Sequence, residues 1–160
     1  KNKYSYTYLF NQFKIMKKKI NILWASMSGT AENVAKQFEN KALDADFDVN
    51  IVELNDISIN ELSNMENVAI ITSTTGEGDL PTNGDDFWVD LEKSTIDLSR
   101  VTYSVCALGD RSHSIFCGAG NKVNKKLMDL GAKKILEITE CDGSDEGSDE
   151  WGNQFLKQVA

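Results

Sequence analysis

Short apolar runs alternate along this chain with stretches in which apolar residues recur every three or four positions. The runs are typical of buried strands, and the periodic stretches are typical of amphipathic helices. Strands are expected over residues 19–25, 48–54, 68–72, 102–108 and 134–138. Helices are expected over residues 30–43, 57–62, 85–91, 121–130 and 150–159.

The alternation predicts an α/β fold, a doubly wound sheet of five parallel strands with helices on both faces. Ligands of such sheets bind beyond the carboxyl ends of the strands, where the strand order switches. Three loops of unusual composition follow the first, third and fourth expected strands. We therefore expect these three loops to form the functional site.

The first loop, residues 26–30, reads Ser-Met-Ser-Gly-Thr and leads into a helix. Gly29 can adopt backbone angles closed to other residues, and Ser28 or Thr30 is expected to cap the helix. Free N–H groups at a helix N-terminus attract anions. Residues 20–35 include no Lys or Arg, so neutral donors would hold a phosphate monoester, not a nucleoside triphosphate. An ordinary capped helix is the alternative explanation.

The other two loops are rich in glycine and small polar residues. Residues 72–83 read Thr-Ser-Thr-Thr-Gly-Glu-Gly-Asp-Leu-Pro-Thr-Asn. Residues 107–120 read Ala-Leu-Gly-Asp-Arg-Ser-His-Ser-Ile-Phe-Cys-Gly-Ala-Gly. Gly76 and Gly78 permit tight turns and a close approach of the backbone to a ligand. A plain surface loop with an acidic rim is the alternative for the second loop.

Composition limits the class of partner and the compartment. The 160 residues carry 17 Lys and Arg against 25 Asp and Glu, a net charge of −8. This argues against nucleic acid or a membrane as partner and favours a basic protein. The three cysteines contain no C-x-x-C pair and suit neither a disulfide framework nor a zinc site, so a cytoplasmic location is expected.

The first residues differ from the rest of the chain because they are rich in Tyr, Asn and Lys. Met16 is followed by three lysines and the first strand, as at a native start. We expect residues 1–15 to be a poorly ordered extension, from a tag or upstream sequence, and residues 16–160 to form the domain. A short aromatic helix that packs on the domain is the alternative.

Together the three loops resemble those of the flavodoxin family. The first resembles its phosphate loop, [ST]-x-[ST]-G-x-[TA]; the second resembles the ST-x-G-E-G-D-x-P-x-N loop of diflavin reductases, such as the sulfite reductase flavoprotein. The third resembles the family's x-L-G-[DN]-x-x-Y-x-x-F-C segment, in the wording of the short-chain MioC group. The resemblance covers residues 19–158. It implies a flavodoxin-like fold with strand order 2-1-3-4-5, and bound FMN.

By this resemblance the first loop holds the FMN phosphate and the second wraps one face of the ring. In the third, residues 108–110 contact the pyrimidine end, His113 covers the outer face, and Phe116 and Cys117 pack just behind. Cys117 has no adjacent base in the sequence, so we expect no nucleophilic role. The implied cofactor-binding residues are Ser26, Met27, Ser28, Gly29, Thr30, Ala31, Ser73, Thr74, Thr75, Gly76, Leu108, Gly109, Asp110, His113, Phe116 and Cys117.

Two positions depart from the family pattern. Thr75 stands where the family often has Tyr or Trp, and His113 stands where it usually has Tyr. An aromatic contact contributes about 0.5–1.5 kcal/mol beyond its area burial, so FMN affinity is expected to be about tenfold lower. His113, the only histidine, is expected to stack on the flavin and to change charge with its redox state. A solvated loop histidine is the alternative.

Acidic residues flank the expected site, and negative potential there would steer basic redox partners. A solvated surface is the alternative for most of them, and Asp142 is a further candidate for cofactor contact. These residues are Glu77, Asp79, Asp85, Asp86, Asp142, Asp145, Glu146, Asp149 and Glu150.

The resemblance implies an electron carrier, not an enzyme, that passes electrons from an NAD(P)H-dependent reductase to acceptor enzymes. We expect a monomer with no metal site and no catalytic residues of its own, and a short-chain form, since the fifth strand lacks a long insertion. Two alternatives remain: a flavodoxin-fold quinone or nitro reductase, and a binding module that has lost the cofactor. A receiver domain does not fit, because Ser26 and Met27 replace its acidic pair.

Overall fold

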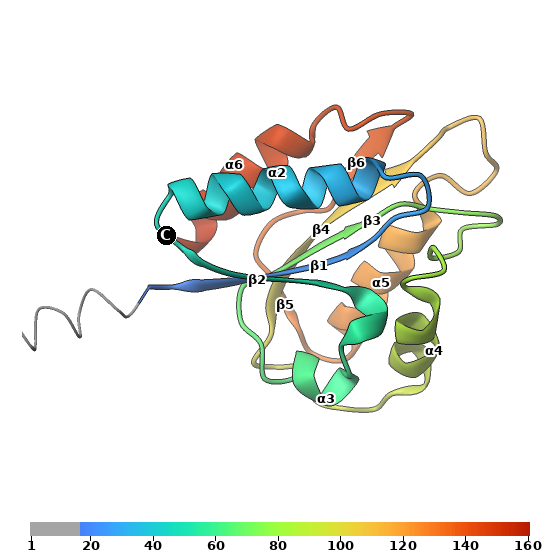
Figure 1. Ribbon diagram of the computed structural model, residues 1–160. Helices are drawn as coiled ribbons and strands as arrows, with labels where there is room; N and C mark the ends of the chain where they lie inside the picture. The colour runs from blue at the N-terminus through green and yellow to red at the C-terminus, as the bar shows by residue number, and fades with distance from the viewer. Residues whose placement is uncertain (1–16) are drawn as a thin grey trace, which may run out of the picture.

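A parallel sheet forms the centre of the molecule, which a computed structural model describes over residues 17–160 (Figure 1). The strand order is β2-β1-β3-β4-β5, as predicted. The strands are β1 (Lys19–Ala25), β2 (Asp48–Glu53), β3 (Val68–Thr72), β4 (Thr102–Gly109), β5 (Lys133–Lys134) and β6 (Thr139–Asp142), and β6 also pairs with β4. The prediction for residues 1–15 lies outside the described residues.

Helices cover both faces of the sheet (Figure 1). On one face lie α2 (Thr30–Asp44) and α6 (Ser148–Val159). On the other lie α3 (Ile59–Leu62), α4 (Asp85–Lys93) and α5 (Gly118–Asp129), together with the 3-10 helix η1 (Leu54–Asp56). Within residues 17–160, no helix combines the length and apolar character that crossing a membrane requires.

Each face of the sheet has its own apolar core. Under α2 and α6, the rings of Phe38, Trp151 and Phe155 pack with centroids 5.3–5.7 Å apart. Along β1, Ile22 belongs to this core, whereas Leu23 belongs to the core on the opposite face. Both faces are covered, which explains why β1 and β3 read as continuous apolar runs and have the predicted bounds.

The register places the functional loops side by side. Ala25, at the end of β1, is paired with Thr72, at the end of β3, and Thr72 is paired with Ala107 in β4. The three loops after these strands therefore leave the same edge of the sheet. This arrangement confirms the predicted parallel topology, and it places the three loops where the site is expected.

The fifth strand differs from its prediction. It is divided into β5 and β6 by residues 135–138, and pairing continues to Asp142, opposite Gly109. In β6 only Cys141 is buried. A half-buried strand at the sheet edge has no apolar run, which explains why its residues read as a loop. The interruption is short, in agreement with the short-chain expectation.

Helix α5 begins at Gly118, three residues before its predicted start. A Cβ atom on Gly120 would lie 2.4 Å from the Cβ of Ala107, so the glycine allows the helix to approach β4 closely. Gly120, which had suggested a loop, therefore serves helix–strand packing. Helix α3 begins at Ile59, with the Ser58 hydroxyl accepting a hydrogen bond from the Glu61 N–H.

Candidate functional site

The first loop connects β1 to α2. Gly29 occupies the N-cap position with φ of 95°, and no side chain caps the helix. The prediction that Ser28 or Thr30 caps it is therefore wrong, because a left-handed glycine stands at the capping position. Instead, the Ser26 hydroxyl accepts a hydrogen bond from the Gly29 N–H at 3.1 Å. The first-turn N–H groups of α2 thus remain without intrahelical acceptors.

The second loop is a tight structure fastened to the first. The backbones of Thr75 and Asp79 exchange two hydrogen bonds of 2.8 Å around the positive-φ residues Gly76 and Gly78. The Ser73 hydroxyl accepts a hydrogen bond from the Met27 N–H at 3.2 Å. These contacts hold residues 73–76 beside the phosphate-type loop.

In the third loop, hydrogen bonds to Asp110 hold a tight turn. The Asp110 carboxylate accepts the Ser112 N–H at 2.8 Å, and its carbonyl accepts the His113 N–H at 3.0 Å. The hydrogen bonds from Ser112, with a smaller contribution from the charge of His113, lower the pKa of the Asp110 carboxyl. An ionised carboxylate is thus favoured beside the exposed imidazole of His113.

Two adjoining hollows, of about 200 and 80 Å³, lie where the three loops meet. Thr74, Asp110 and His113 line both of them. The larger is lined by Ser28, Thr30, Ser73, Thr74, Leu108, Gly109, Asp110, His113, Gly143 and Ser144. The smaller is lined by Thr74, Thr75, Gly76, Asp110, His113 and Ile115. Among these described residues, His113 supplies the only aromatic ring.

Sequence reasoning missed three of the lining residues, Ile115, Gly143 and Ser144. The last two follow β6 and enter the site because this strand ends beside β4. The Asp-Gly pair at residues 142–143 is a turn signal that was available in the sequence. Gly143 has φ of 70°, as such a turn requires.

Several predicted contact residues do not face the hollows. Ala31 and Cys117 are fully buried, so neither side chain lines the hollows, and Cys117 packs behind the third loop. Burial raises the pKa of the Cys117 thiol to about 12, which keeps it neutral. Met27 is 57% exposed and, like Ser26, is not among the lining residues. Phe116 is half-buried against the core, with the Arg111 guanidinium 4.3 Å from its ring centroid.

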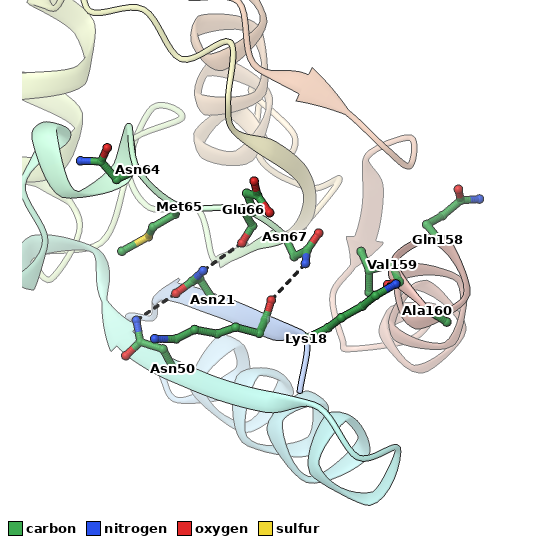
Figure 2. Close-up of a pocket in the computed structure, with 11 residues that line it drawn as sticks. Lys18, Asn21, Asn50, Asn64, Met65, Glu66, Asn67, Gln158, Val159 and Ala160 are labelled. Carbon is green, nitrogen blue, oxygen red and sulfur yellow. Dashed lines mark hydrogen bonds between the residues drawn. The ribbon is translucent and has the colours of Figure 1, made fainter. Parts of the chain in front are cut away.

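A larger hollow, of about 630 Å³, lies at the opposite, amino end of the strands (Figure 2). Its amides are engaged with one another. Asn50 donates a hydrogen bond of 3.1 Å to the side chain of Asn21, and Asn21 donates one of 2.9 Å to the carbonyl of Glu66. Asn67 donates to the carbonyl of Lys19 at 3.1 Å. These contacts join β1 to β2 and to the residues just before β3, and each of the three amides donates one hydrogen bond within the protein.

Residues 17–160 hold no cluster of His, Cys, Asp or Glu suited to a metal ion. The chemistry available at the carboxyl-end hollow is therefore that of N–H groups, hydroxyls, one carboxylate and one imidazole. Such a set suits a phosphate and a polar ring.

Comparisons with known proteins agree with this geometry. The flavodoxin family model matches residues 22–151. The chain is 34% identical over 143 residues to the sulfite reductase [NADPH] subunit beta of Schizosaccharomyces pombe, covering 85% of this chain and 10% of that protein. It is 36% identical over 129 residues to NADPH oxidoreductase A of Dictyostelium discoideum, covering 79% and 20%. The chain thus spans only a tenth to a fifth of these relatives.

Solved structures of similar length also match. The Streptococcus pneumonia TIGR4 flavodoxin superposes with a TM-score of 0.76 at 28% identity, covering 88% of this chain and 97% of that one. Oxidised flavodoxin 2 from Bacillus cereus superposes with a TM-score of 0.76 at 27% identity, covering 88% and 99%.

Proposed function

The chain belongs to the flavodoxin family, and we propose that it carries electrons on an FMN held where the loops after β1, β3 and β4 meet. Flavodoxins bind FMN and transfer electrons. The cofactor supplies the redox chemistry, and the protein supplies binding, orientation and electrostatics. The observation that carries the proposal is the convergence of all three loops on the hollow at the N-terminus of α2.

The residues present fit this cofactor. The N–H groups of the first turn of α2, with the hydroxyls of Ser28 and Thr30, suit a phosphate monoester. We assign residues 73–76 to one face of the ring and Leu108, Gly109 and Asp110 to its pyrimidine end. His113, at the junction of the two hollows, covers the outer face.

We infer a shuttle between an NAD(P)H-dependent reductase and acceptor enzymes, whether these are separate proteins or further domains. The relatives named as reductases or oxidoreductases are much longer, and the chain matches only a small part of each. We propose that nicotinamide and substrate sites belong to those other parts, and that the domain is monomeric.

We propose that the partners are basic. Besides Asp110, five acidic residues beside the site are exposed, and the chain has a net charge of −8. Negative potential around a cofactor raises the association rate of positively charged partners, an effect that salt screens. These residues are Glu77, Asp79, Asp142, Asp145 and Glu146.

A visible absorption spectrum before and after addition of FMN, with excess cofactor removed, tests the proposal. Retained flavin bands with quenched fluorescence are expected, and no NADPH oxidation by the isolated protein. Protein that retains no FMN would contradict the carrier. NADPH oxidation by the flavin-loaded protein alone would instead support the reductase alternative.

A further inference from the structure

Asp142 stands at the end of β6, beside the site. Asp142 is not among the residues that line the two hollows. The Asp142 carboxylate accepts the backbone N–H of Arg111 at 2.9 Å and pairs with Arg111 Nε at 3.3 Å. Because 31 positions separate the two residues, the contact ties the third loop, residues 110–117, to a strand that follows much later.

The same loop is fastened at both of its ends. At its start, the Gly143 N–H donates to the Gly109 carbonyl at 2.7 Å. Towards its end, the guanidinium of Arg111 lies over the ring of Phe116, which packs against the core. Arg111 thus joins Asp142 on one side to Phe116 on the other, and we name these three residues the strap.

Ser112 and His113 lie between Arg111 and Phe116, and Asp110 immediately precedes Arg111. The hydrogen bonds of this turn are local, from Ser112 and His113 to Asp110. Local turn contacts fix the shape of the turn but not its place above the sheet. That place also depends on contacts outside the turn: those of Arg111, and the packing of Ile115 beside Gly78 and Gly118.

We propose that Asp142 is a positioning residue, which acts through Arg111 to hold Asp110 and His113 facing the hollow before the cofactor arrives. The consequence for flavin affinity rests on the proposed function, whereas the ordering of the loop does not. A loop that is ordered in advance loses less conformational entropy on binding, so the cofactor binds more tightly.

The two Asp142 contacts differ in strength. The side chains of Arg111 and Asp142 are 70% and 46% exposed, so their ion pair alone contributes little. The hydrogen bond from the Arg111 N–H is charge-assisted and stronger. Asparagine keeps an acceptor for this N–H but loses the ion pair, and alanine loses both. The series from aspartate through asparagine to alanine should therefore be graded.

Hydrogen exchange of the apoprotein and FMN titration test the proposal on Asp142→Asn, Asp142→Ala and Asp145→Ala. The last variant removes a neighbouring charge that makes no contact with the loop. For Asp142→Ala we expect amide exchange over residues 111–114 to be about tenfold faster and the Kd for FMN to be about tenfold higher. Asp142→Asn should fall between wild type and Asp142→Ala, and Asp145→Ala should stay within about twofold of wild type.

Unchanged exchange in Asp142→Ala would overturn the strap, and faster exchange with unchanged affinity would overturn the positioning role. A higher Kd with unchanged exchange would assign Asp142 to direct cofactor contact and also overturn it. If wild type binds no FMN, the proposed function fails, while the exchange data still decide whether the strap orders the loop.

Discussion

The two ends of the parallel sheet carry hollows of unequal size and opposite chemistry. At the amino end, about 630 Å³ is lined by lysines and by amides, of which Asn21 and Asn50 donate hydrogen bonds to neighbouring segments (Figure 2). At the carboxyl end, only about 200 and 80 Å³ are enclosed, but the donors of a helix N-terminus and several hydroxyls gather there. The comparison teaches that the meeting of a helix N-terminus with three loops, not volume, distinguishes the proposed binding end of this fold.

The largest expected effect is on FMN affinity, when a carboxylate is introduced at the carboxyl-end hollow. Thr30→Asp puts a negative charge at the first position of α2, where it stabilises the helix but repels a phosphate. We expect FMN affinity to fall about 100-fold, equivalent to about 2.7 kcal/mol, with thermal stability unchanged or higher. Fluorescence titration and calorimetry measure the two quantities.

Asn64→Asp is the control for this charge, because Asn64 is exposed and lines the amino-end hollow. It should leave FMN affinity unchanged. An equal loss of FMN affinity in both variants would contradict the assignment of the binding site to the carboxyl end.

Removing the amide of Asn21 should lower stability and leave FMN affinity unchanged, the reverse of Thr30→Asp. Asn21→Leu keeps the approximate size of a side chain that is 5% exposed, but leaves the Glu66 carbonyl and the Asn50 amide without this partner. We expect a loss of about 1–3 kcal/mol in the free energy of unfolding, measured in urea. FMN affinity should be unchanged, and a loss of binding would show that the two ends are coupled.

His113→Tyr restores the aromatic ring that the family usually has at this position. FMN affinity should rise up to about tenfold, since an aromatic contact contributes about 0.5–1.5 kcal/mol. Imidazole ordinarily changes charge between pH 5 and 8, so the reduction potential of wild type should depend more steeply on pH in this range. Potentiometry that finds equal slopes in both proteins would remove His113 from the redox response.

The smallest expected effect is on stability at acid pH, and two turns that each contain an aspartate form a matched pair for measuring it. Asp97, before β4, and Asp110, after it, each accept the N–H of the residue two positions later, and these hydrogen bonds lower the pKa of both carboxyls. A lowered pKa contributes stability that is present above the unfolded value, near 3.8, and is lost as the pH falls through the folded value.

Asn substitution at either position should therefore flatten the acid limb of the stability curve below about pH 4 by a similar small amount. Only Asp110→Asn should also change FMN affinity, because Asp110 lines the hollows. Urea unfolding at several pH values and FMN titration check both statements. A change of FMN affinity in Asp97→Asn would contradict the division between the two ends.

The sequence predicted best those features that depend on burial from both faces. The bounds of β1 and β3 follow from their apolar runs, and the meeting of the three loops follows from the topology of parallel sheets. The half-buried strand β6 has no such run. The positive φ of Gly29, which decides that no side chain caps α2, is a choice of backbone conformation that composition does not reveal.

Contacts between residues far apart in the chain also could not be predicted from the sequence. Asp142 was a candidate for cofactor contact, but its carboxylate is engaged by Arg111. Ala31 was among the implied cofactor-binding residues, but its side chain is fully buried in the core under α2. A motif identifies residues that belong together, whereas the packing decides which of them face a ligand.

The most direct test of the account is a titration of isotopically labelled apoprotein with FMN, followed by backbone amide NMR. The account predicts that the largest shift changes fall in residues 28–32, 73–76 and 108–113, with residues 64–67 and 158–160 at the amino-end hollow unaffected. Changes concentrated at residues 18–21, 64–67 and 158–160, with the three loops unperturbed, would contradict it.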